Sequence, residues 1–342
     1  MLNKKVISAV LAGGVAAISF SAVLIRLAEA DPAVIAFYRL FFASLLLAPW
    51  AGKDWKKIRL SHRQLALMVG AGVFLALHFL LWMTSLEHTS VASSVVLVTT
   101  QPLFVFLFSI VFLREVPPRS MWGGLLLALA GSVLVVFGQG AAGQSRLLGN
   151  LLALGGAVMM ALYFLAGRKV RGDVPLALYS ALVYGFSSAA LALFILWQGL
   201  PWGGYNAQTW RLFFLLALLP TILGHNSLNW ALKYLPATMV SVVILGEPIG
   251  AALLAGLILK EIPAWIEIFG GGLILAGIFL VWRNDPKTGQ AGSAENLQEQ
   301  QAGGAEKTYS YALPPAGAEG KAENQAENPG IGRPAEESRQ KA

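Results

Sequence analysis

The sequence QPLFVFLFSIVFLREVP at residues 101–117 recurs in the same register as EPIGAALLAGLILKEIP at residues 247–263. Each copy begins with a polar residue and Pro, and ends with Leu, a basic residue, Glu, an aliphatic residue and Pro. The register continues without a gap into Ala130-Gly131 and Ala276-Gly277. Such a match at a fixed offset indicates an internal duplication. The two halves of the chain are therefore expected to fold alike.

The composition around this repeat is that of a membrane protein. Of the 342 residues, 56% are hydrophobic and 13% are charged, whereas soluble chains carry about 25% charged residues. Apolar stretches of about 17–25 residues, the length that crosses the hydrocarbon core, recur along the chain. They are continuously apolar rather than alternating, which favours helices over a β-barrel. The sequence predicts an all-α integral membrane protein with ten transmembrane helices, at roughly 5–27, 32–50, 64–86, 90–113, 119–138, 148–167, 175–197, 211–233, 237–259 and 263–282.

The basic residues are distributed unevenly between the two ends of these spans. If the N-terminus is cytoplasmic, most Lys and Arg residues fall on the cytoplasmic side, and the opposite side receives only Arg26, Arg146, Arg211 and Lys260. The positive-inside rule thus predicts a multi-pass protein of the cytoplasmic (inner) membrane with both termini in the cytoplasm. The net charge of +7 then follows from topology. Because the basic residues are divided among short loops, nucleic acid is not an expected partner.

The duplication divides the membrane region into two halves, at 5–138 and 148–283, joined by a linker at 139–147. Five spans in each half make the second copy enter the membrane from the opposite side, so the expected fold is two inverted five-helix repeats. Residues 284–342 are rich in Gly, Ala, Glu, Gln and Lys, a composition typical of a disordered cytoplasmic tail.

The first span resembles a signal peptide in its Lys4-Lys5 start and in Ala28-Glu29-Ala30. Against cleavage, the apolar stretch is long and Arg26 interrupts it. The stretch from Gly13 also has a counterpart beginning at Gly155. We therefore expect the first span to be retained.

The repeated motif also resembles a known family. Gln101-Pro102 followed by Arg114-Glu115, and Glu247-Pro248 followed by Lys260-Glu261, each lead into a Gly-rich last helix. This pattern is similar to the drug/metabolite transporter superfamily, and within it to the EamA-like members with ten helices and two EamA repeats. Arg39 in the second span fits an arginine common in the family. The resemblance covers roughly residues 5–283 and implies transport, but the family moves amino acids, drugs, sugars and other metabolites, so it implies no single substrate.

Four ionisable residues lie deep in the predicted spans, where they are costly and normally face a cavity or one another: Arg39, His78, His225 and Glu247. Glu247 precedes Pro248, whose ring is expected to leave the carbonyl of Ile244 without its helical partner. A free carbonyl beside a carboxyl could coordinate an amine or take up a proton. The alternative is a structural carboxyl that pairs with Arg39. Arg39 itself could hold a substrate carboxylate or act as a permanent internal counter-ion.

The predicted substrate-binding residues share helix faces with these groups. Residues one turn apart lie on one face, so a mixed polar and aromatic pocket is expected, and interhelical hydrogen bonding is the alternative for each member. Gln101 occupies the place of Glu247 in the first half, with Thr99 and Thr100 nearby as weaker candidates. The full predicted set is Arg39, His78, Trp82, Gln101, His225, Asn226, Asn229 and Glu247.

Other residues are assigned no chemistry. Glu115 and Glu261 are expected to form interfacial ion pairs with the adjacent Arg114 and Lys260. His62 and His88 lack metal-ligand spacing. With no Cys, no thiolate site exists. With no Walker sequence, ATP-driven transport by this chain alone is not expected. No catalytic residue, metal or cofactor is predicted.

The expected function is a secondary transporter, more specifically an exporter, of a small organic metabolite or drug by alternating access, with proton coupling through Glu247 left open. The alternative is a membrane-embedded enzyme acting on a lipid-like substrate, which would need catalytic groups gathered at one interface. The expected partners are a small-molecule substrate and the lipid bilayer. The sequence leaves open whether the chain forms a homodimer.

Overall fold

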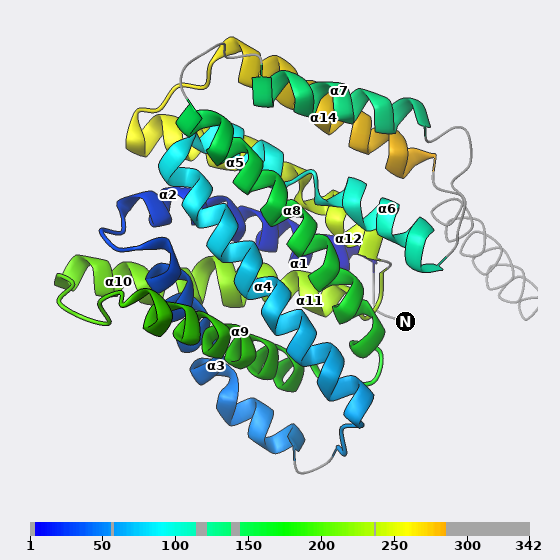
Figure 1. Ribbon diagram of the computed structural model, residues 1–342. Helices are drawn as coiled ribbons and strands as arrows, with labels where there is room; N and C mark the ends of the chain where they lie inside the picture. The colour runs from blue at the N-terminus through cyan, green and yellow to red at the C-terminus, as the bar shows by residue number, and fades with distance from the viewer. Residues whose placement is uncertain (1–3, 56–57, 114–121, 138–143, 236, 285–342) are drawn as a thin grey trace, which may run out of the picture. The chain divides into compact units, whose positions relative to one another are not determined.

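Helices make up the regular structure throughout the part of the chain described by the computed structural model, residues 4–55, 58–113, 122–137, 144–235 and 237–284 (Figure 1). These residues belong to one compact unit. The helices of the first half are α1 (Lys4–Ser19), α2 (Ser21–Leu27), α3 (Pro32–Trp55), α4 (His62–His88), α5 (Val91–Val98), α6 (Gln101–Leu113) and α7 (Trp122–Phe137). The helices of the second half are α8 (Gln144–Val170), α9 (Leu176–Gln198), α10 (Ala207–Leu216), η2 (Ala217–His225), α11 (Asn226–Ala231), α12 (Ala237–Val243), η3 (Ile244–Gly246), α13 (Glu247–Leu254), η4 (Ala255–Leu259) and α14 (Trp265–Arg283).

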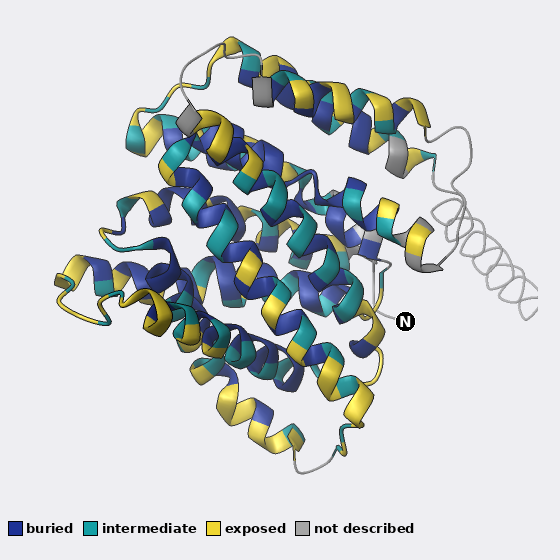
Figure 2. Ribbon diagram, in the orientation of Figure 1, coloured by how far each residue is buried: buried dark blue, intermediate teal, exposed yellow. Residues whose placement is uncertain are grey.

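Many of these helices have the length and composition of membrane spans. Seven helical stretches in the described residues are long and apolar enough to cross a bilayer, and three shorter apolar helices follow the same pattern at Trp122–Val135, Ile244–Leu259 and Trp265–Leu280. Figure 2 shows buried faces where helices meet and exposed faces on the outside. Large apolar side chains such as Leu193, Leu257 and Trp265 lie on those outer faces. This is the distribution of a bundle that lipid surrounds, and the prediction of an all-helical membrane fold is confirmed.

Both repeated X-Pro sites interrupt a span. In the first half, Thr99 and Thr100 separate α5 from α6, which begins at Gln101. In the second half, the 3₁₀ turn η3 separates α12 from α13, which begins at Glu247. The N–H groups in the first turn of a helix have no partner within the helix, so a proline at the second residue costs no hydrogen bond. Each proline therefore fits the start of the new helix. The duplication therefore places a helix break with a polar residue, Gln101 or Glu247, at matching points of the two halves.

The expectation of a free carbonyl at Ile244 is wrong. The N–H of Glu247 donates to the oxygen of Ile244. In an α-helix the oxygen of Ile244 would accept from residue 248, but Pro248 has no N–H. The backbone instead forms a 3₁₀ turn, in which the N–H of Glu247 takes that place. Glu247 is left as the polar group that distinguishes this break.

The two halves contact each other in matched pairs. Helix α1 packs on η2 and α11, α3 packs on α9, α4 packs on α8, and α7 packs on α14. Small residues make the close approaches, because a Cβ added at Gly14 would lie 2.9 Å from the Cβ of Ser227, and one at Gly156 would lie 3.3 Å from the Cβ of Trp82. Gly246 and Gly250 face α1 in the same way, with Gly250 against Ser19. Gly14, Gly156 and Gly250 are thus interface residues.

Some predicted features lie outside the described residues. These are Arg114 and Glu115, most of the linker at 139–147, and the tail from residue 285 onward.

Candidate functional site

A small cavity lies between the two halves, and we call it the central pocket. Its volume is about 20 Å³, which is room for a water molecule and not for a metabolite. It is lined by Ile18, His78, Trp82, Val98, Thr99, Gln101, Met160, His225, Leu228, Ile244 and Glu247. Five of the eight predicted substrate-binding residues belong to this set.

Equivalent positions of the two repeats meet at the central pocket. Gln101 of the first half aligns with Glu247 of the second half in the repeat register, and His78 and His225 are one residue from exact alignment in that register. The apolar lining obeys the same rule, since Ile18 and Met160 each follow a paired glycine by four residues, and Val98 and Ile244 each precede the X-Pro site by three. The sequence analysis missed the apolar residues, and the repeat register was the signal that could have found them.

The imidazole of His78 is fixed by a backbone contact. Its Nδ1 lies 2.9 Å from the oxygen of Gly156, and because a carbonyl only accepts, Nδ1 carries the proton. In the neutral ring Nε2 is then an acceptor. The ring stacks on Trp82, with centroids 5.9 Å apart and planes at 17°. The close helix contact at Gly156 therefore sets the orientation of both rings.

Three polar groups of the pocket lack protein partners. The indole Nε1 of Trp82 and the Nδ1 of His225 are buried without a hydrogen bond. Glu247 is 6% exposed as a residue, and within the described residues its carboxyl makes no hydrogen bond or ion pair. Buried polar groups in proteins are nearly always satisfied, so each exception calls for an explanation. A polar ligand in an expanded form of this pocket would satisfy all three.

Arg39 lies behind the pocket rather than in its wall. Its Nε donates to the hydroxyl of Thr221 at 2.6 Å and its Nη1 to the hydroxyl of Ser21 at 2.8 Å. The guanidinium carbon is 4.2 Å from the centroid of the Phe79 ring. Across the described residues no ion pair joins Arg39 to Glu247, so the structure shows no direct counter-ion pair between them.

Asn226 and Asn229 also lie outside the pocket. The Oδ1 of Asn229 accepts from the hydroxyl of Tyr163 at 2.5 Å, and its Nδ2 donates to the hydroxyl of Tyr184 at 3.2 Å. The Oδ1 of Asn226 accepts from the hydroxyl of Ser180 at 2.5 Å. Both amides are therefore used in contacts with α8 and α9, the interhelical alternative that the sequence left open. Thr99 lines the pocket, whereas Thr100 donates to the oxygen of Leu97.

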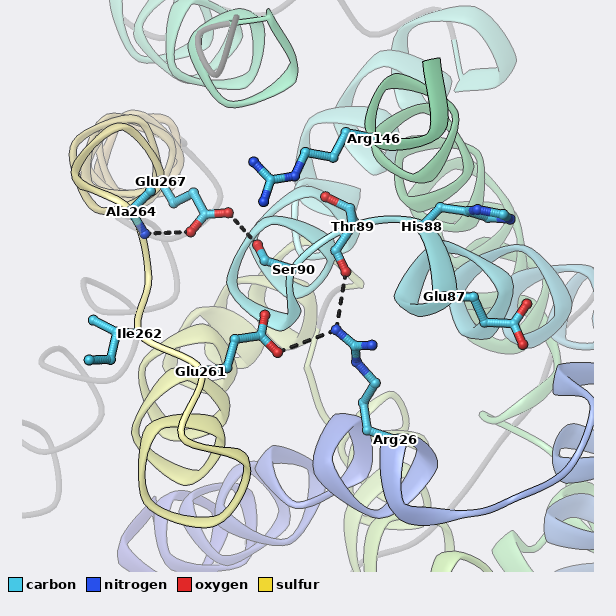
Figure 3. A pocket seen from close by; sticks show the side chains of 10 residues that line it. All are labelled: Arg26, Glu87, His88, Thr89, Ser90, Arg146, Glu261, Ile262, Ala264 and Glu267. Atoms are coloured by element: carbon cyan, nitrogen blue, oxygen red, sulfur yellow. Dashed lines mark hydrogen bonds and ion pairs between the residues drawn. The ribbon is translucent and has the colours of Figure 1, made fainter. Parts of the chain in front are cut away.

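A second, larger cavity opens at one end of the bundle, and we call it the vestibule. Its volume is about 390 Å³, and it is lined by Arg26, Glu87, His88, Thr89, Ser90, Arg146, Glu261, Ile262, Ala264 and Glu267 (Figure 3). Here the predicted pairing of Glu261 with Lys260 is wrong, because Glu261 Oε2 lies 3.3 Å from Arg26 Nη2. Lys260 has a left-handed backbone, with φ of 56°, and the chain turns there, so that Lys260 is exposed while Glu261 points into the cavity.

Comparison with known proteins decides the family. The model of the EamA-like transporter family matches this chain twice, at residues 3–137 and 147–283. The chain belongs to the EamA-like transporter family. The names of this family and of the relatives indicate a multi-pass membrane transporter rather than an enzyme.

Named relatives of this EamA-like transporter include bacterial and archaeal proteins. An uncharacterized transporter of Archaeoglobus fulgidus is 26% identical over 276 residues, which cover 77% of this chain and 91% of the relative. The pseudopaline exporter CntI of Pseudomonas aeruginosa is 27% identical over 293 residues, which cover 83% of this chain and 97% of the relative. A solved crystal structure aligns with a TM-score of 0.59 at 18% identity, covering 82% of this chain and 98% of the other, which supports the fold.

Proposed function

We propose that this EamA-like protein is a secondary transporter that exports a small organic metabolite or drug by alternating access, with the central pocket as its substrate site. The observation that carries the proposal is a pocket lined by corresponding elements of both halves, in which Trp82 and His225 each hold a buried polar atom without a partner. Glu247 adds a carboxyl to the same lining. Transporters built from repeats bind substrate at the interface between repeats. The volume of about 20 Å³ then corresponds to a closed conformation that expands when substrate enters.

The helix pairing supports inverted repeats. The second helices of the two halves, α3 and α9, pack on each other, and so do the last helices, α7 and α14. The first span of each half packs on the third span of the other half: α1 contacts η2 and α11, and α8 contacts α4. This is the contact pattern of two copies related by a two-fold axis. With five spans in each half the axis lies in the membrane plane, and one half can rock against the other around the pocket. The positive-inside distribution places both termini in the cytoplasm.

Glu247 is the group proposed to couple transport to protons. It is the only carboxyl that lines the central pocket in the described part of the chain, and its repeat mate Gln101 does not titrate. Alternation between a protonated carboxyl and a substrate-bound carboxylate would exchange one proton for one substrate. Export is the proposed direction because a relative that aligns over 97% of its length is named an exporter. The substrates of that relative are not carried over.

The proposed function is tested first by ligand stabilisation. Purified protein is screened by thermal unfolding against amines, amino acids, nucleosides and sugars, since a ligand that binds the folded state raises its melting temperature. Each hit is then measured for flux into proteoliposomes with and without a pH gradient. The proposal predicts at least one solute that both stabilises and crosses. Lipid turnover in detergent without solute flux would contradict it and favour the enzyme alternative.

Substitution of Trp82 by Phe is expected to separate stability from binding. Removing an unpartnered buried N–H stabilises the fold by about 1 kcal/mol, and this offsets about the same cost for the cavity that the smaller ring leaves, so the free energy of unfolding should change little. The affinity for the solute found in the screen should fall about 10-fold, because its acceptor loses a donor. Both quantities come from thermal unfolding across a solute titration. The control is Trp230→Phe, which alters a ring that packs on Tyr234 outside the pocket, and equal affinities in the two variants would contradict the role of Trp82.

A further inference from the structure

The vestibule and the central pocket are lined by the same helical elements at two depths. The first span contributes Ile18 to the pocket and Arg26 to the vestibule, α4 contributes Trp82 and His88, and α8 contributes Met160 and Arg146. The fourth span lines the pocket with Val98, and Ser90 just before it lines the vestibule. The ninth span lines the pocket with Glu247, and Glu261 just after it lines the vestibule. The eight residues of α5, about 12 Å of helix, separate the two cavities. The vestibule is therefore the cavity that leads toward the central pocket at this end of the bundle.

This end lies away from both termini of the bundle. The first span begins with Lys4 in α1 and reaches the vestibule with Arg26, while α14 begins beside the vestibule at Trp265 and ends at Arg283. With both termini in the cytoplasm, the vestibule faces the outside.

Two carboxylates from the ninth and tenth spans hold the N-terminus of α5 in the vestibule. Glu261 Oε1 accepts the N–H of Val91 at 2.6 Å. Glu267 Oε1 accepts from the hydroxyl of Ser93 at 2.7 Å and also from the hydroxyl of Ser90. Negative charge at a helix N-terminus is stabilised by the unpaired N–H groups and by the helix dipole. The second half of the chain thus binds the outer end of the fourth span of the first half through hydrogen bonds.

Arg26 connects the first span to this contact. Its Nη2 lies 3.3 Å from Glu261 Oε2 and 3.4 Å from the oxygen of Thr89 (Figure 3). One guanidinium therefore joins the end of the first span to the connection between the third and fourth spans and to the residue that follows the ninth. We name the contact of Arg26, Glu261 and the start of α5 the latch. In the side chains of Arg26 and Glu261, 34% and 25% of the surface is exposed to solvent. An ion pair of this exposure is weak and sensitive to salt, as suits a contact that breaks and reforms in each cycle.

We propose that the latch is the outer gate of the transport path, closed in this structure, and that it must break for the central pocket to open to the outside. The inference rests on the transport function proposed above. Alternating access requires that the spans lining the pocket separate at one end while they stay together at the other. The latch joins three of those spans at the end where the vestibule opens.

The absence of Cys from the chain makes the gate directly testable. Thr99→Cys places a single thiol in the central pocket. Its rate of labelling by a membrane-impermeant maleimide is measured in right-side-out and inside-out vesicles. Adding Glu261→Gln or Arg26→Gln should raise the rate about 10-fold in right-side-out vesicles, because the open state becomes more populated. The charge swap R26E/E261R should bring the rate only part of the way back, because it restores the ion pair but leaves the N–H of Val91 without its acceptor.

Lys260→Gln is the matched control. It removes a charge next to Glu261 in the sequence from an exposed side chain and should leave labelling unchanged. Salt offers a measurement that needs no change in the latch. Raising the ionic strength from about 0.1 M to about 1 M shortens the Debye length from roughly 10 Å to roughly 3 Å, so labelling of Thr99→Cys should rise and that of the Glu261→Gln variant should respond less.

The proposal is overturned if labelling stays the same in the latch variants and with salt, or if it rises only in inside-out vesicles. The labelling needs no substrate, so it separates the gate from the proposed function. Solute flux with unchanged labelling removes the gate alone. A rise in labelling from a protein that carries no solute in the flux screen removes the proposed function and leaves a conformational latch.

Discussion

Replacing Glu247 with Gln is expected to abolish uphill transport driven by a pH gradient. Glu247 lines the central pocket and is 6% exposed as a residue, and an amide of the same shape cannot release or take up the proton. Gln also loses the charged hydrogen bond that the carboxylate is proposed to make to the substrate, which costs about 1.5–3 kcal/mol. The transport rate should therefore fall roughly 10- to 100-fold at the pH where the unmodified protein is fastest. The rate that is left should no longer vary with pH.

The measurement is solute flux in proteoliposomes at several internal and external pH values. Glu29→Gln is the matched control, because it neutralises an exposed carboxyl whose one hydrogen bond within the described residues comes from Asn206. Its flux should equal that of the unmodified protein. The double change Q101E/E247Q moves the carboxyl to the equivalent place in the other repeat and asks whether coupling follows it. An unchanged rate and pH profile in Glu247→Gln would show that the carboxyl is structural.

The sequence was sufficient for the overall fold, because two regularities determine it. Long apolar stretches specify membrane helices, since backbone groups in lipid must bond within their own helix. The repeat at 101–117 and 247–263 indicates where each half breaks, because a proline displaces the helical bond at the same step of both copies. Depth selected His78, His225 and Glu247, and also Arg39, which lies outside the pocket. A shared helix face selected Trp82, and the repeat register selected Gln101. These last two line the same cavity as the two histidines and Glu247.

What sequence could not supply was the choice of partner for each polar group. Arg39 reaches Thr221, which is 182 residues away, and Asn229 reaches Tyr163 and Tyr184. Nothing in the local pattern distinguishes such side chains from those left facing a cavity. Glu261 was paired with its neighbour Lys260 by proximity in the chain, but the left-handed turn at Lys260 presents Glu261 to Arg26 instead. Competition among distant hydrogen-bond partners therefore decided which predicted residues lie in the pocket.

Gly277→Leu is expected to have the largest effect on stability, because it separates α14 from α7. A Cβ at Gly277 would lie 2.4 Å from the N of Ala128 and 2.6 Å from the O of Gly124. Both atoms belong to backbone, so no side chain can rotate to make room. Overpacking of this kind costs about 1–3 kcal/mol or more, and the contact it breaks is the main one of α14. The melting temperature in detergent should drop, and the yield of monodisperse protein should fall with it.

Gly272→Leu is the control within the same helix. A Cβ there meets nothing within 4 Å, and Leu is the better helix former by up to about 1 kcal/mol, so the melting temperature should stay level or rise. The two variants carry the same change in composition and hydrophobicity and differ only in which face of α14 receives the side chain. Equal melting temperatures would mean that α7 and α14 do not pack through Gly277. A selective loss in Gly277→Leu would establish that the fifth helices of the two halves are joined by direct backbone contact, as a two-fold arrangement of the repeats requires.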